Sequence, residues 1–139
     1  MGDRKKLAKK LKRIKMLLLD VDGVLTDGGI LYSANGVEMK RFNAHDGYGA
    51  IRAREHGLRL AVISGRQTPI VDVRAREMQI DDVVQNATDK VAAMEELRRR
   101  YGLEVDEVAF IGDDLFDLPL LKAVGFSAAR GSELAGLGR

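Results

Sequence analysis

The hydrophobic pattern of the chain alternates short, wholly apolar runs with longer amphipathic segments. Runs that are apolar throughout are typical of strands covered on both faces of a parallel sheet. Five short runs that are wholly or largely apolar predict strands, at residues 16–19, 58–63, 83–84, 108–111 and 126–129. Capping residues and helix breakers predict helices between them, at 47–56, at 69–78, from after Thr88 to near Gly102, and around Pro119 up to Gly125. This order indicates an α/β fold, a doubly wound, Rossmann-like parallel sheet that binds ligands at the carboxyl ends of its strands.

Residues 28–42 depart from this alternation. Two short extended stretches, residues 30–32 and 37–42, flank Asn35-Gly36, a dipeptide that favours the turn of a β-hairpin. Because the hairpin directly follows the first strand, we expect it to overhang the carboxyl edge of the sheet. We therefore expect one domain at residues 16–139 with this hairpin inserted, preceded by a basic arm at residues 1–15.

The net charge of +2 is distributed unevenly along the 139 residues. Eight of the basic residues lie between Arg4 and Lys15, so the remainder of the chain is acidic. A basic arm can bind phosphates, but this one has no aromatic residue to stack on bases, and its apolar residues form one stripe of a short solvated helix. We therefore expect no nucleic-acid partner. With no cysteine and no apolar stretch of the ~20 residues that a membrane span needs, we also expect no thiol chemistry, no membrane partner and a cytoplasmic location.

Aspartates follow two of the predicted strands. Asp20 and Asp22 come after the first strand, and Asp113, Asp114 and Asp117 come after the fourth. If these strands are neighbours in one parallel sheet, their carboxyl ends meet at one place, where several carboxylates repel unless a cation neutralises them. An all-oxygen cluster of this kind is typical of Mg²⁺, which keeps several waters and uses one or two carboxylates together with a substrate phosphate.

The spacing of Asp20 and Asp22 indicates phosphoryl chemistry. One carboxylate can attack phosphorus to form an aspartyl-phosphate, and the second can act as general acid and then as general base. Ser64 and Lys90, near the ends of other elements, can hold the phosphoryl oxygens. Each residue alone has a simpler interpretation: Ser64 as a helix cap, Lys90 as a solvated side chain, and the aspartates after the fourth strand as a turn. Their joint placement at successive strand ends favours a catalytic site.

Four motifs in this order resemble those of the haloacid dehalogenase-like phosphohydrolases. They are Asp20-Val-Asp-Gly-Val-Leu-Thr-Asp27, Ile63-Ser-Gly-Arg66, Asp89-Lys90 and Gly112-Asp-Asp-Leu-Phe-Asp117. The Thr26-Asp27-Gly28 continuation, the hairpin in place of a cap, and Phe42-Asn-Ala-His-Asp-Gly-Tyr-Gly49 are similar to the capless family that dephosphorylates 3-deoxy-D-manno-octulosonate (KDO) 8-phosphate.

The resemblance implies a role for each matching residue. Asp20 would be the nucleophile and a Mg²⁺ ligand, and Asp22 the acid/base that also gives its backbone carbonyl to the metal and contacts the substrate. Asp113 would be the third metal ligand, with Asp114 and Asp117 in support. Ser64 and Lys90 would hold the phosphate. The residues implied to approach the sugar acid are Asn43, His45, Asp46, Gly47, Arg66 and Arg74.

The resemblance also implies a homotetramer that associates through the hairpins, and apolar hairpin residues favour this. Family members continue into a further strand and an arginine-bearing tail, for which Gly131-Ser-Glu-Leu-Ala-Gly-Leu-Gly-Arg139 is no convincing counterpart, so we expect turnover or substrate affinity to differ. Three alternatives stay open: a phosphatase of nonulosonate 9-phosphates or of another small phosphorylated sugar, a phosphoacceptor module of the receiver type, and a non-catalytic partner subunit.

Overall fold

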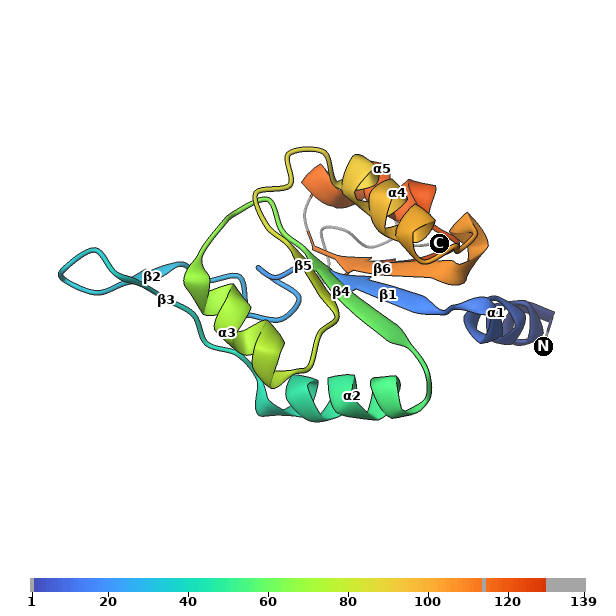
Figure 1. Ribbon diagram of the computed structural model, residues 1–139, viewed down its shortest axis with the longest axis horizontal. Helices are drawn as coiled ribbons and strands as arrows, with labels where there is room; N and C mark the ends of the chain where they lie inside the picture. Colours follow the sequence, from blue (N-terminus) through green and yellow to red (C-terminus); the bar gives the residue numbers. More distant parts are fainter. Residues whose placement is uncertain (1, 114, 130–139) are drawn as a thin grey trace.

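The chain folds around a five-stranded, wholly parallel sheet flanked by helices (Figure 1). The computed structural model describes residues 2–113 and 115–129, so Asp114 and the tail at 131–139 lie outside the described residues. The strand order is β5-β4-β1-β6-β7. The strands are β1 (Met16–Leu19), β4 (Arg59–Ile63), β5 (Asp82–Val84), β6 (Val108–Gly112) and β7 (Phe126–Ala129). All five predicted strands are present, and the predicted doubly wound α/β class is confirmed.

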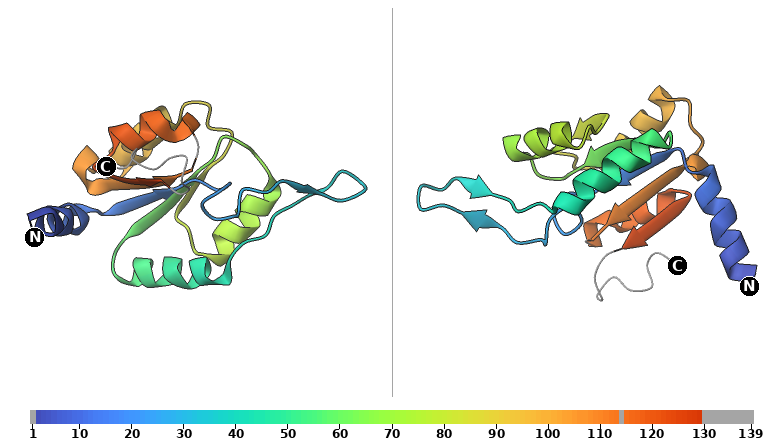
Figure 2. Two further views of the ribbon diagram at one scale, coloured as in Figure 1. Left: turned by 180° about the vertical axis from the view of Figure 1, so that it is seen from behind. Right: turned by 90° about the horizontal axis from the view of Figure 1, so that it is seen from below.

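Helices cover both faces of the sheet, as Figures 1 and 2 show. On one side lie α2 (Ala44–Glu55) and α3 (Pro69–Glu77), and on the other lie α4 (Lys90–Arg100) and α5 (Leu118–Ala123). Two short 3₁₀ turns, η1 (Val105–Glu107) and η2 (Leu115–Asp117), flank β6. No helix among residues 2–113 and 115–129 is long and apolar enough to cross a membrane.

The two cores follow directly from the two-residue period of the strands. Along β1, Met16 and Leu18 pack with α4 and α5, whereas Leu17 and Leu19 pack on the side of α2 and α3. Successive side chains of a strand point to opposite faces, so a strand buried on both sides must be apolar at every position. This requirement explains why the central strands β1 and β6 are continuous apolar runs in the sequence.

The hairpin is shorter than the sequence predicts. Its strands are β2 (Leu31–Tyr32) and β3 (Glu38–Met39), paired antiparallel, and it projects from the carboxyl edge of the main sheet (Figure 1). At the turn, the Gly36 N–H donates to the carbonyl of Ser33 at 2.9 Å, and Gly36 has φ +78°. With two residues paired on each strand, the hairpin has little internal stability, and its rigidity depends on contacts at its base.

Of the starts of α2 and α4, the first differs from the prediction and the second agrees with it. Helix α2 begins at Ala44 instead of residue 47, because the Asn43 side chain accepts a hydrogen bond from the His45 N–H and caps the helix there. Helix α4 begins at Lys90, after Thr88 as predicted, and is capped by Asp89, whose side chain accepts from the Ala92 N–H at 3.0 Å. In both cases the side chain that reaches the free N–H groups sets the boundary.

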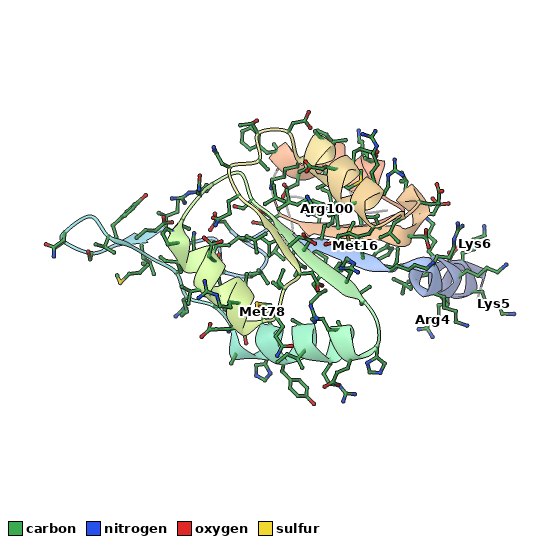
Figure 3. The ribbon with its side chains drawn as sticks, in the orientation of Figure 1. Arg4, Lys5, Lys6, Met16, Met78 and Arg100 are labelled. Atoms are coloured by element: carbon green, nitrogen blue, oxygen red, sulfur yellow. The ribbon has the colours of Figure 1, made fainter. Side chains whose placement is uncertain are left out.

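The basic arm forms helix α1 (Gly2–Arg13), which has no buried residue. It lies beyond the amino ends of the strands, at the opposite end of the molecule from the hairpin (Figures 1 and 2). Arg4, Lys5 and Lys6 point away from the rest of the protein (Figure 3). Arg13 forms an exposed ion pair with Asp106 at 3.3 Å. An exposed pair of this kind adds at most about 1 kcal/mol of stability.

Candidate active site

The carboxyl ends of β1 and β6 lie side by side at the centre of the sheet. Leu19 is in register with Ile111, and the Asp20 N–H continues the ladder by donating to the Ile111 carbonyl at 3.1 Å. Parallel pairing therefore brings the aspartates that follow β1 next to Asp113, which follows β6. Although 93 positions separate Asp20 from Asp113 in the sequence, the two belong to one site.

The loop after β1 is held in a tight turn by its own backbone and by Thr26. The Thr26 hydroxyl is buried and accepts from the N–H groups of Gly23 (3.2 Å) and Gly28 (3.1 Å). Gly23 has φ +87°, and a Cβ at this position would collide with the carboxylate of Asp113. Glycine is thus required at position 23 for two reasons: its backbone conformation and the close approach of the Asp113 side chain.

The ammonium group of Lys90, the first residue of α4, lies between two carboxylates. Its ammonium lies 3.1 Å from Asp20 Oδ1 and 2.6 Å from Asp117 Oδ1. Asp117 is fully buried, and its Oδ2 accepts from the Asp113 N–H at 3.0 Å. Burial raises the pKa of Asp20 to about 6, against the opposing effect of Lys90 and with a further increase from Asp117. Although burial disfavours its charge, Lys90 has a raised pKa because of the two carboxylates.

These groups line a cavity of about 750 Å³ at the carboxyl edge of the sheet. The buried Ser64, at the end of β4, contributes to its wall, and the Ser64 hydroxyl accepts from the Arg66 N–H at 3.3 Å. Ile30 and Phe116 lie at the apolar part of the lining, and Phe116 is 85% exposed. The predicted residues that share this cavity are Asp20, Asp22, Ser64, Arg66, Lys90, Asp113 and Asp117.

The other residues implied to bind a sugar acid lie outside this cavity. Asn43 caps α2, and its carbonyl accepts from the Arg74 guanidinium at 2.9 Å. Arg74 also lies over the Phe42 ring at 5.6 Å and packs against Gly47. Of the predicted residues, Asn43, His45, Asp46, Gly47 and Arg74 are not part of the cavity lining in the single chain. Their role in substrate binding stays a prediction.

Lys40 is a site residue that sequence reasoning missed. Its ammonium lies 2.6 Å from Asp22 Oδ1 and 3.1 Å from Glu38 Oε1, and its side chain is only 1% exposed. Glu38 in turn pairs with Arg66 at 3.0 Å. The available signal was the alternation within the hairpin: Glu38 and Lys40 are two residues apart, and so share the face opposite Val37 and Met39.

The chemistry of the donor set fits a hard divalent cation. The predicted ligands, Asp20, Asp113 and the backbone carbonyl of Asp22, supply only oxygen, which is the ligand type that Mg²⁺ uses. Within the part of the chain that the structure describes, no three acidic or imidazole side chains are grouped so that they could hold a metal ion by themselves. This is compatible with Mg²⁺, which needs one or two carboxylates and keeps waters.

A family model for haloacid dehalogenase-like hydrolases matches residues 46–125, which is more than half of the chain. The chain belongs to this family. The match runs from the first turn of α2 through β4, α4 and β6 to the end of α5. In this haloacid dehalogenase-like hydrolase, the matched segment therefore carries Ser64, Lys90 and Asp113, and the β1 aspartates precede it.

Individual relatives resemble this hydrolase over most of its length. The 3-deoxy-D-manno-octulosonate 8-phosphate phosphatase KdsC of Escherichia coli K12 is 39% identical over 120 residues, which are 86% of this chain and 64% of the relative. The corresponding protein of Haemophilus influenzae is 38% identical over 88% of this chain and 68% of its own length. This chain thus spans about two thirds of the length of these curated relatives.

Solved structures give the same similarity. The Moraxella catarrhalis 3-deoxy-D-manno-octulosonate 8-phosphate phosphatase, solved with magnesium, phosphate and KDO, has a TM-score of 0.87 and 40% identity over 89% of this chain and 71% of its own. The cobalt-bound phosphatase of H. influenzae has a TM-score of 0.82 and 39% identity over 86% and 70%. The predicted fold and family are confirmed by these likenesses.

Proposed function

We propose that this protein is a Mg²⁺-dependent phosphatase that hydrolyses a phosphorylated sugar acid through an aspartyl-phosphate on Asp20. The observation that carries the proposal is the position of Asp20: it is buried at the end of the central strand, it contacts Lys90, and it lines the cavity together with Asp22. This arrangement supplies a nucleophile, an acid/base two residues away and a fixed positive charge.

In the first half of the reaction, a carboxylate oxygen of Asp20 attacks phosphorus while the bond to the leaving oxygen breaks. Asp22 gives its proton to that oxygen, and the sugar acid leaves as an alcohol. In the second half, Asp22 takes a proton from water, whose oxygen attacks the phosphorus of the aspartyl-phosphate and releases phosphate. Lys90 and the Ser64 hydroxyl hold phosphoryl oxygens. Mg²⁺, held by Asp20, Asp113 and the Asp22 carbonyl, would neutralise negative charge on the carboxylates and the phosphoryl group.

The proposed substrate is KDO 8-phosphate. The support is that the matched relatives are named as phosphatases of this compound and that one related structure contains KDO, phosphate and magnesium. On this chain, Arg66 at the cavity wall offers a planar guanidinium suited to a carboxylate. Nonulosonate 9-phosphates carry the same two groups, a carboxylate and a phosphate, so they are the competing substrates in a panel assay.

We also propose that the protein works as a homotetramer in the cytoplasm. The hairpin supports the assembly, because Leu31, Tyr32, Val37 and Met39 are each about half exposed or more, and a monomer would leave this apolar surface in water. Light scattering after gel filtration tests this proposal, with the variant Tyr32→Ser/Val37→Ser. The proposal expects a tetramer for the native chain and smaller species for the variant. A monomeric native chain would refute it.

The activity is tested with Asp20→Asn and Asp22→Ala and with a panel of phosphorylated sugars and sugar acids in the presence of Mg²⁺. We expect both variants to lose hydrolysis while their circular dichroism stays native. We expect KDO 8-phosphate to be the preferred substrate of the native chain. Retained activity in Asp20→Asn would contradict the mechanism. A phosphorylated protein that persists for minutes would instead favour a phosphoacceptor module.

A further inference from the structure

The base of the hairpin makes direct contact with the proposed acid/base. Lys40 follows β3, and its ammonium donates a hydrogen bond to Asp22 Oδ1 at 2.6 Å. The two residues are 18 positions apart, so this contact is made by the fold and not by local geometry. The side chain of Asp22 is 27% exposed, whereas that of Lys40 is 1% exposed. The lysine therefore holds the carboxylate from the protein side and leaves the other side open to the cavity.

The position of Lys40 is determined by a second carboxylate. Glu38 Oε1 lies 3.1 Å from the Lys40 ammonium and 3.0 Å from the Arg66 guanidinium. Both contacts of Glu38 Oε1 are ion pairs without the geometry of a hydrogen bond. This buried oxygen accepts no hydrogen bond within the described residues. Glu38 therefore offsets the buried positive charge, while the directional bond of the ammonium goes to Asp22. A lysine this deeply buried needs such pairing.

We propose that Lys40 is a positioning residue for Asp22: it holds Oδ1, so that Oδ2 is the oxygen that exchanges the proton with the leaving group. This inference rests on the proposed function. Among residues 2–113 and 115–129, no group donates a hydrogen bond to Asp22 Oδ2. The proton on Oδ2 passes to the leaving oxygen as its bond to phosphorus breaks. In the second half, Oδ2 takes a proton from the attacking water, so the carboxyl group returns to its starting state.

The role connects the hairpin to catalysis. A carboxylate held by one oxygen keeps one rotamer, and an acid/base must be within hydrogen-bond reach of the proton it transfers. Without Lys40, Asp22 can rotate about its side-chain bonds, and the fraction of productive encounters falls. Glu38 and Lys40 lie on the hairpin, and Arg66 follows β4, so the Glu38–Arg66 pair fixes the hairpin base against the main sheet.

The test compares two substrates that differ in their need for an acid. An alkyl phosphate such as KDO 8-phosphate has a poor leaving group that must be protonated, whereas p-nitrophenyl phosphate releases a stable phenolate without protonation. The measured quantity is kcat/KM, which covers only the steps up to formation of the aspartyl-phosphate. For Lys40→Met we expect kcat/KM to fall about 10- to 100-fold on the alkyl phosphate and less than about 3-fold on the aryl phosphate, since general acid catalysis contributes 10²–10⁴-fold in total.

The matched control is Arg41→Met, which removes the adjacent positive charge. Arg41 is 80% exposed and pairs with Asp27 at 2.9 Å, so we expect it to leave both kcat/KM values unchanged. In an Asp22→Ala background, Lys40→Met should cause no further loss in the single-turnover release of p-nitrophenolate, which needs no acid, because the residue acts through Asp22. If Lys40→Met does not fold, Lys40→Ala, which also removes the donor, takes its place, and the same contrast between substrates applies.

The outcomes separate this inference from the proposed function. Equal losses on the two substrates, or no loss on the alkyl phosphate, would overturn the positioning role and leave the phosphatase intact. A further loss in the Asp22→Ala background would also overturn it. A native chain that hydrolyses neither substrate would overturn the proposed function together with the inference. A selective loss on the alkyl phosphate supports both.

Discussion

Replacement of Lys90 by methionine removes the cation that lies between two carboxylates. In the native chain the Lys90 ammonium contacts Asp20 at 3.1 Å and Asp117 at 2.6 Å, and the side chain of Asp117 is fully inaccessible to solvent. Methionine has nearly the same length, so the change removes charge and leaves the packing almost as it was. Breaking a buried ion pair in this way destabilises a protein by about 3–5 kcal/mol, because the remaining charge is buried without a partner.

The destabilisation should depend on pH in a defined direction. Burial raises the pKa of Asp20 from 3.8 to about 6 even though Lys90 lowers it, so removal of Lys90 raises this pKa further. When the pKa of a carboxyl group is higher in the folded state than in the unfolded state, the free energy of unfolding falls as pH rises from the unfolded-state pKa to the folded-state pKa. The deficit of Lys90→Met therefore grows as pH rises above about 6 and shrinks toward about pH 4, where Asp20 is protonated in the folded protein.

The assay is thermal unfolding followed by circular dichroism without divalent metal, at about pH 7.5 and about pH 4.5. At neutral pH we expect Lys90→Met to lower Tm by about 10–15 °C, since 1 kcal/mol corresponds to roughly 3 °C for a domain of this size. Lys90→Met/Asp117→Asn should recover part of the loss, because one of the unpaired charges is removed. The control Lys122→Met changes an exposed lysine and should stay within about 0.5 kcal/mol of native. A loss below about 1 kcal/mol, or one that is the same at both pH values, would refute the reasoning.

Three further predictions concern other parts of the protein. Gly23→Ala should lower kcat at least about tenfold and weaken Mg²⁺ binding measured by calorimetry, because a Cβ there displaces Asp113 and strains a backbone with φ +87°; unchanged Mg²⁺ affinity would contradict this. Asp81→Ala should lower the free energy of unfolding by about 1–3 kcal/mol, measured with urea, without changing kcat, since Asp81 pairs with Arg54 and accepts from the Leu60 N–H at 3.0 Å far from the cavity. Chelation by EDTA should abolish hydrolysis, and added Mg²⁺ should restore it; hydrolysis that persists in EDTA would exclude the proposed metal dependence.

Much of the fold was determined by local patterns in the sequence. A strand buried on both faces must be apolar at every position, so β1 and β6 are recognisable as runs such as residues 16–19 and 108–111 without knowledge of their neighbours. Helix starts were predicted less well where several capping residues stand close together. The start of α2 at Ala44 was missed because Asn43, and not a later residue, reaches the free N–H groups.

The candidate site residues could also be named from the sequence, but their arrangement could not. Asp20, Lys90 and Asp113 could be named from motif order and from their places at element ends. That Lys90 bonds to the buried Asp117 as well as to Asp20 depends on how α4 and η2 pack over the sheet. The raised pKa of Asp20 depends on the same packing, since burial and neighbouring charges arise only in the folded protein.

Tertiary structure alone decided which residues contact the proposed acid/base and which do not. In the sequence, alternation places Lys40 on the face of Glu38 and Arg41 on the other face, but nothing local indicates that the Lys40 face meets Asp22. In the fold, Lys40 turns inward to Asp22, while Arg41 stays in solvent. Arg74, in contrast, was predicted to approach the substrate, but in the fold its guanidinium donates a hydrogen bond to the carbonyl of Asn43 outside the cavity. Periodicity and capping act over a few residues and can be read along the chain, whereas ion pairs between distant elements exist only once strand register and helix packing have placed them.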